Sequence, residues 1–186
     1  MMKMLPGMTV INPCDYNQTK AATISIAEYN GPVYLRFGRP KVPIFIHEDT
    51  PFEIGKALLL QEGTDVSIFA TGHLVWQAVE AAQELAKDGL SVELINIHTI
   101  KPLDKESILS SVAKTKCVVT AEEHQVAGGM GESKAKLVAN NHPVTMKFVA
   151  VNDKFGESGK PADLMKKYGL HSSDIIKATH SVLKRK

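Results

Sequence analysis

Short apolar runs rich in β-branched residues alternate with amphipathic segments along most of this chain, and this alternation limits the fold more than any other feature. The runs lie at residues 66–70, 92–97, 117–120 and 146–151, and helix-forming segments separate them. Strands that alternate with helices form a mostly parallel sheet with helices on both faces. The sequence therefore predicts an α/β fold whose main sheet is mostly parallel and flanked by helices.

Helix start and stop signals divide the stretches between these strands. We expect one short helix before Gly63, and longer helices at residues 74–87, from Asp104 to beyond Val112, from the glycine cluster at 128–131 to about Asn140, at 162–168 and at 172–183. Asp104 is the expected N-cap of its helix, because a carboxylate there accepts hydrogen bonds from free backbone N–H groups.

The first 42 residues have the pattern of a separate β-α-β unit. Thr9–Ile11 reads as a strand, Asp15 as the N-cap of a helix to about Glu28, and residues 33–37 as a second strand. The two strands are expected to be parallel, with a right-handed crossover. Residues 43–55 contain two of the three clustered prolines and are the expected linker to a domain at residues 56–186.

Charge and cysteine content exclude several classes of protein. The formal net charge is +2 and the acids and bases are interspersed, which argues against a nucleic-acid partner. No apolar stretch reaches the 18 or so residues of a membrane span. Cys14 and Cys117 show no C-x-x-C spacing and the seven histidines show no metal-ligand spacing, so no metal site is expected. A reducing cytoplasm is the expected setting.

Four short motifs occur in a fixed order. They are Thr99-Ile-Lys-Pro-Leu-Asp104, Ala121-Glu-Glu-His124, Gly128-Gly-Met-Gly131 and Phe155-Gly-Glu-Ser-Gly159, the last followed by Tyr168-Gly-Leu170. With them, the chain resembles the C-terminal part of the transketolase family of thiamine diphosphate enzymes. The resemblance assigns residues 1–42 to the last part of the pyrimidine-binding domain and residues 56–186 to the transketolase C-terminal domain. Related domains lie at the C-terminus of pyruvate-dehydrogenase-type beta subunits and of deoxyxylulose-phosphate synthases. Both of these kinds of enzyme remain alternatives.

The resemblance implies a parent transferase of carbohydrate metabolism, in the pentose phosphate pathway. Such an enzyme transfers a two-carbon ketol unit between phosphorylated sugars, using thiamine diphosphate and Mg²⁺. In such an enzyme, this chain would have the N-terminal, diphosphate-binding part as its partner. The full enzyme would be a homodimer or a heterotetramer. The family's Gly-Asp-Gly motif for the coenzyme is missing here, and the family's coenzyme-activating glutamate lies earlier than this chain reaches.

We therefore expect the chain alone to bind no coenzyme, to hold no catalytic residue and to be inactive, with a structural and dimer-supporting role. Its start inside the pyrimidine-binding domain suggests a truncated or incomplete product. A sheet edge at residues 8–12 or 33–37 is then expected to be exposed and prone to pairing.

In relatives, an arginine at the end of the strand at residues 33–37 binds the phosphate of the sugar substrate. Arg36 and Arg39 are the candidates here. A guanidinium suits this role because it stays charged and offers a planar fork of donors to phosphate oxygens. Residues three apart on a strand point to opposite faces, so both enter one pocket only if the strand ends between them. The transketolase register favours Arg39, and a structural ion pair is the alternative for either residue.

A second set of candidates lies around the glycine cluster. Gly129 and Gly131 open a helix, and free N–H groups at a helix start bind anions. Tight packing of this helix start against the sheet is the interpretation we favour. His124 follows Glu122 and Glu123 at the end of a strand, where acid–base groups of α/β proteins gather, although in relatives this segment mainly orders the domain. A stand-alone module that binds an anion or a nucleotide therefore remains an alternative of another class.

Overall fold

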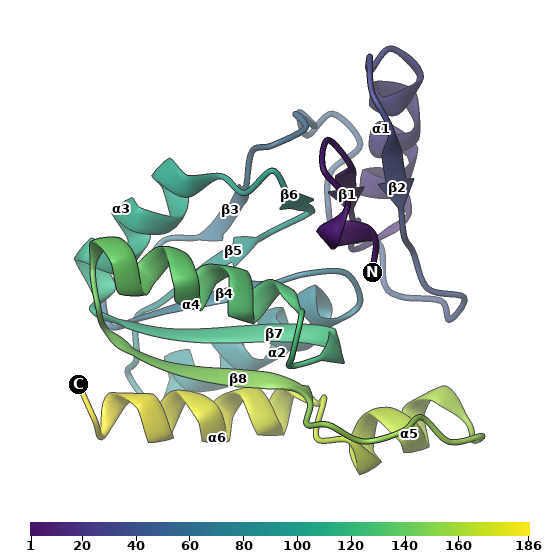
Figure 1. Cartoon of the computed structure of the whole chain (residues 1–186). Coiled ribbons are helices and arrows are strands. Elements are labelled where there is room, and N and C mark those ends of the chain that lie inside the picture. The colour runs from purple at the N-terminus through teal and green to yellow at the C-terminus, as the bar shows by residue number, and fades with distance from the viewer.

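The computed structural model describes all 186 residues and contains two β-sheets (Figure 1). The strands are β1 (Thr9–Ile11), β2 (Val33–Leu35), β3 (Leu58–Gln61), β4 (Val66–Ala70), β5 (Val92–Asn96), β6 (Thr99–Lys101), β7 (Cys117–Gln125) and β8 (Thr145–Val151). The helices are the 3-10 helix η1 (Met2–Met4), α1 (Tyr16–Ala27), α2 (Leu74–Lys87), α3 (Lys105–Thr115), α4 (Met130–Asn141), α5 (Pro161–Lys167) and α6 (Ser172–Leu183). No helix combines the length and apolar character that crossing a membrane requires.

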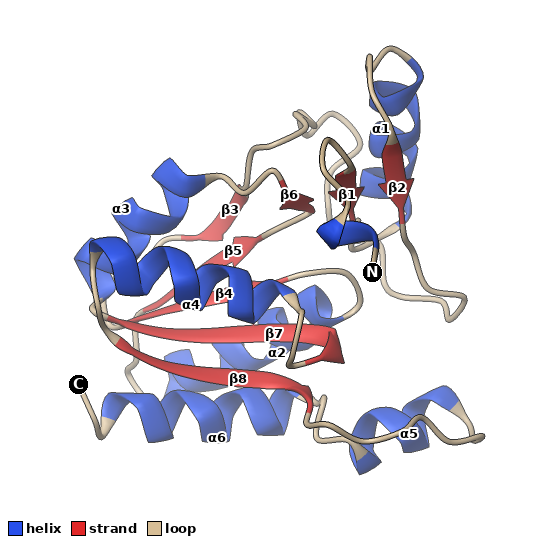
Figure 2. Ribbon diagram, viewed as in Figure 1, coloured by secondary structure: helices blue, strands red, loops and turns tan.

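The larger sheet has the strand order β3-β5-β4-β7-β8. β4 pairs in parallel with β5 and β7, and β7 pairs in parallel with β8. Helices α2 and α6 cover one face of this sheet, and α3 and α4 cover the other (Figure 2). The expected α/β fold, with a mostly parallel sheet between helices, is confirmed.

Strand β4 shows how the core divides between the two faces. All five of its residues are buried, and successive side chains point to opposite faces of the sheet. Val66, Ile68 and Ala70 join the core against α2 and α6, whereas Phe69 joins Ile108 of α3 and the apolar residues of α4. Each fully buried side chain of this size contributes about 1.5–3 kcal/mol relative to an exposed one.

The prediction of a short helix before Gly63 is wrong, because this segment forms strand β3. Leu58 to Gln61 pair antiparallel with β5 and complete that side of the sheet. A helix of so few residues is marginal, whereas the edge of β5 offers unpaired backbone groups. The backbone of Gly63 packs directly on Val92 and Glu93, with no room for a Cβ. Strand β7 is longer than expected and reaches Gln125.

The smaller sheet contains the predicted β-α-β unit and one strand from the rest of the chain. β1 and β2 pair in parallel, as expected. β6, from the motif that leads into α3, pairs antiparallel with β1. The order is therefore β2-β1-β6, so of the two places where a free edge was expected, residues 8–12 are covered by β6 and the strand at 33–37 is the edge. The edge at β2 has no partner strand, and this strand ends at Leu35 rather than at residue 37.

Two aspartates cap helices as predicted, and one of them also fixes the segment after β2. Asp104 Oδ1 accepts a hydrogen bond from the N–H of Ser107. Asp15 Oδ1 accepts from the N–H of Gln18, and its Oδ2 accepts from the N–H groups of Phe45 and Ile46 at 2.9 and 2.8 Å. Residues 36–57 contain no regular helix or strand, but this carboxylate anchors them to the start of α1.

Candidate functional site

The carboxyl ends of β4 and β7 form the part of the large sheet best suited to bind a ligand. These neighbouring strands are followed by helices on opposite faces, since β4 leads to α2 and β7 leads to α4. In open α/β sheets, ligands bind in the crevice at such a topological switch point. Thr71 and His73 follow β4 here, and Glu122, Glu123 and His124 lie in the last part of β7.

Glu122 occupies the helix start that the glycine motif forms. Its two carboxylate oxygens accept hydrogen bonds from the N–H groups of Met130 and Gly131 at 2.6 and 2.7 Å, and the residue is 2% exposed. A Cβ on Gly129 would lie 2.6 Å from these oxygens, and one on Gly131 would lie 2.7 Å from Phe148. The glycines therefore allow the close approach of α4 to the sheet, and the anion at this helix start is the chain's own carboxylate.

Two lysines lie close to this carboxylate. Lys134 of α4 is completely buried, its Nζ makes no hydrogen bond, and it lies 5.7 Å from the centre of the Phe69 ring. Burial lowers the pKa of Lys134 to about 7, and the charge of Glu122 opposes this shift. Lys3 donates hydrogen bonds to the carbonyl oxygen of Gly129 and to Ser133 Oγ, so the N-terminal segment is attached to α4.

Glu123 joins the two sheets through Arg36 and His73. The Arg36 Nη2 donates a hydrogen bond of 3.0 Å to the Glu123 carbonyl oxygen. The Glu123 side chain lies 3.2 Å from His73 Nδ1, and this hydrogen bond, aided by the charge of Arg36, lowers the pKa of Glu123 below its usual value. The His73 ring fills the space above Gly38, where no Cβ would fit. The loop after β2 is thus held against the large sheet.

Two cavities lie on either side of these residues. The first, about 480 Å³, lies between the N-terminal segment and α4, and Arg36, Glu122, His124 and Gly129 line it. The second, about 840 Å³, lies between α2 and α5, and His73, Glu123 and His124 line it. His124 lines both cavities and is exposed, and its Nδ1 forms a hydrogen bond of 2.8 Å with the Gln125 carbonyl oxygen.

The structure separates the two candidate arginines. Arg36 is half-buried in the first cavity, together with His124 and Gly129. Arg39 is exposed on the loop after β2, makes no hydrogen bond or ion pair within the chain, and lines neither cavity. His73 was not among the candidates. The only sequence signal that could have identified it is its position three residues after the buried strand β4.

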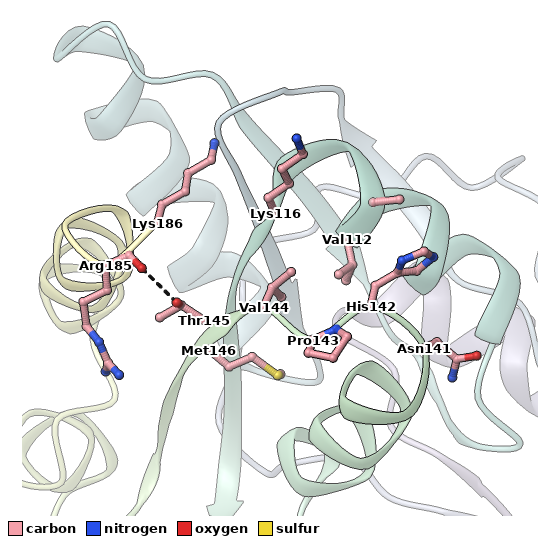
Figure 3. A pocket seen from close by; sticks show the side chains of 11 residues that line it. Val112, Lys116, Asn141, His142, Pro143, Val144, Thr145, Met146, Arg185 and Lys186 are labelled. Atoms are coloured by element: carbon pink, nitrogen blue, oxygen red, sulfur yellow. Dashed lines mark hydrogen bonds between the residues drawn. The ribbon is translucent and has the colours of Figure 1, made fainter.

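A third cavity of about 950 Å³ lies at the opposite end of the sheet, where β7 and β8 begin (Figure 3). Lys116, His142 and Lys186 surround it without any acidic residue, and the guanidinium of Arg185 points away from it. The Arg185 carbonyl oxygen accepts a hydrogen bond from Thr145 Oγ1. No three His, Cys, Asp or Glu residues lie together in a way that could hold a metal ion.

Fold and cleft together define the class of protein: a doubly wound α/β domain with a switch-point cleft, joined to a separate β-α-β unit. Within that class, residues 55–175 match the family model for "Transketolase, C-terminal domain". The chain belongs to the transketolase family, and it contains this domain.

Two relatives and one solved structure similar to this chain are named as transketolases or as parts of them. The chain is 45% identical over 185 residues to a 6-deoxy-6-sulfo-D-fructose transketolase subunit from Clostridium sp. (strain MSTE9), and the match covers 100% of this chain and 58% of the relative. It is 40% identical over 188 residues to a protein from Methanocaldococcus jannaschii named as a transketolase C-terminal section, over 99% of this chain and 58% of the relative. Among solved structures, a split gene transketolase, described as an inactive beta4 tetramer, matches with a TM-score of 0.95 and 41% identity, over 98% of this chain and 60% of that one. The chain thus spans about three fifths of each of these relatives.

Proposed function

We propose that this chain is the C-terminal portion of a transketolase-like enzyme, a cytoplasmic transferase that moves a two-carbon ketol unit between phosphorylated sugars. The observation that supports this most is the match of residues 55–175 to the transketolase C-terminal domain. The β-α-β unit before that domain agrees with part of a pyrimidine-binding domain, because its strand β2 lacks a second neighbour.

The chain alone is proposed to be inactive and to complete and stabilise a larger assembly. The coenzyme of this family, thiamine diphosphate with Mg²⁺, requires hard oxygen ligands around the metal ion. The side chains here do not fit that requirement, since no acidic cluster is present and the sequence has no Gly-Asp-Gly motif. The N-terminal, diphosphate-binding part of the enzyme is therefore the proposed partner, in a dimer or heterotetramer. The solved structure described as an inactive beta4 tetramer of a split gene transketolase is consistent with a C-terminal part that needs a separate partner for activity.

Arg39 is the proposed ligand of the substrate phosphate, and Arg36 the residue that braces its loop. Arg39 is exposed and has all its donors free, as a bidentate phosphate ligand requires. Arg36 already donates to the Glu123 carbonyl oxygen. The loop that carries Arg39 is held by the contact between Gly38 and His73.

The test uses the chain mixed with the N-terminal part of its enzyme, and measures ketol transfer to an aldose phosphate and to the same aldose without phosphate. Arg39→Ala is expected to raise the KM for the phosphorylated sugar about 10- to 100-fold, because a charge-assisted hydrogen bond contributes about 1.5–3 kcal/mol. The unphosphorylated sugar should be affected much less. Arg185→Ala, an exposed arginine at the other end of the sheet, is the matched control.

Two outcomes would contradict the proposal in different ways. An unchanged KM for the phosphorylated sugar in Arg39→Ala would remove Arg39 from the site but leave the enzyme assignment. Failure of the two parts to associate, measured by size-exclusion chromatography, together with no transfer activity in the wild-type mixture, would contradict the assignment itself.

A further inference from the structure

The cavity of about 840 Å³ between α2 and α5 has no part in the function proposed above, since neither Arg36 nor Arg39 lines it. Its wall is largely apolar and includes Trp76, Leu164, Met165 and Tyr168. Helix α5 has no buried residue and extends away from the body of the molecule (Figure 1). Cavities of this size, with an apolar wall and a few polar groups, are typical of small-molecule sites.

The two acids that line this cavity both have donors beside them. Glu157 is paired with Lys167 at 2.5 Å, and Glu123 lies 3.2 Å from His73 Nδ1 and close to the charge of Arg36. Two lysines of the lining, Lys41 and Lys160, make no ion pair and donate no side-chain hydrogen bond. Positive charge at the rim is therefore left without a partner.

The start of α2, which forms one wall, adds to this positive potential. The N-cap residue His73 makes no capping hydrogen bond with its side chain, and the first turn contains no acidic residue. In contrast, carboxylates accept from the first-turn N–H groups of α1, α3 and α4. The positive end of the α2 dipole is thus not offset by its own capping group.

We propose that this cavity binds a small amphipathic anion, with an aromatic or branched apolar body and one carboxylate, sulfonate or phosphate group. The body packs against Trp76 and the apolar side of α5, and the anionic group lies at the rim beside Lys41 and Lys160. The inference does not depend on the proposed enzyme, because the proposal for ketol transfer assigns no role to Trp76, Lys41 or Lys160.

The test uses the intact chain and the probe 8-anilinonaphthalene-1-sulfonate, an aromatic anion. Trp76 is the only tryptophan, so energy transfer from tryptophan to the bound probe shows that the probe lies within transfer range of Trp76, and the rim variant below assigns the binding to this cavity. N-phenyl-1-naphthylamine, which has the same aromatic body without the sulfonate, separates anion recognition from apolar binding. The variant Lys41→Glu/Lys160→Glu reverses the rim charge. Lys105→Glu/Lys136→Glu makes the same change at two exposed lysines outside the cavity and is the matched control.

We expect one probe per chain, with quenching of Trp76 fluorescence and binding that is tighter than that of the uncharged analogue. The rim variant should weaken binding of the sulfonate about tenfold, as expected for the loss of two exposed ion pairs, and leave the uncharged analogue unchanged. The control variant should bind like the wild type. Equal affinity of both double variants for the sulfonate, or probe fluorescence without quenching of Trp76, would overturn the proposal.

Discussion

Replacement of Glu122 tests whether an internal carboxylate holds α4 on the sheet. In Glu122→Ala, the buried N–H groups of Met130 and Gly131 lose their only acceptor. Each buried donor left unpaired costs about 1–3 kcal/mol, and the buried ammonium of Lys134 loses a nearby opposite charge. The expected loss in the free energy of unfolding is therefore about 3–5 kcal/mol.

The measurement is urea unfolding followed by circular dichroism at neutral pH. Such a loss is a large part of the total stability of a domain, so Glu122→Gln serves as the milder variant. Its amide keeps one acceptor oxygen, and we expect a loss of about 2–3 kcal/mol. Glu106→Gln and Glu106→Ala, at an exposed acid in the first turn of α3, are the matched controls. A loss below about 1 kcal/mol in Glu122→Ala, similar to that of its control, would refute the capping role.

Three further predictions concern stability. Burial lowers the pKa of His98 to about 4, so as pH falls from 6.5 to 4 the unfolded chain binds a proton that the folded chain does not. This difference should lower the free energy of unfolding by up to about 3 kcal/mol over this range, and His98→Gln should reduce the slope in urea titrations by this contribution. Gly131→Ala should cost about 1–3 kcal/mol because its Cβ would collide with Phe148, whereas Gly156→Ala, with open space and an ordinary backbone, should be neutral in thermal unfolding. Lys134→Met should raise the urea midpoint, since an unpaired buried ammonium is replaced by an apolar chain of similar length; an unchanged or lower midpoint would show that this lysine has a partner.

The sequence predicted the parts of the fold that depend on local pattern. The strands β4 and β5 read as mostly apolar runs, and all of their residues are buried because helices cover both faces of the sheet. Asp15 and Asp104 were found as caps because a cap depends on residues within one turn. These signals act over a few residues, so they can be read without knowing what the segment packs against.

The strands that were missed depend on distant partners. β3 carries leucines that suit a helix equally well, and only the open edge of β5 makes it extended. β6 has three residues, and its partner β1 lies about ninety positions earlier in the chain. At the candidate site, the sequence pointed to the glycine cluster but not to Glu122 as its occupant, because a hydrogen bond eight residues apart across a turn has no local signature.

The pairing of β6 with β1 has a consequence for how the molecule unfolds. A strand that follows β5 completes the sheet of the N-terminal unit, so neither part can lose its structure without breaking backbone hydrogen bonds of the other. The two regions therefore form one cooperative unit despite the irregular segment between them. A protease cut within residues 43–55 should leave both pieces associated, and heat should melt them in a single transition.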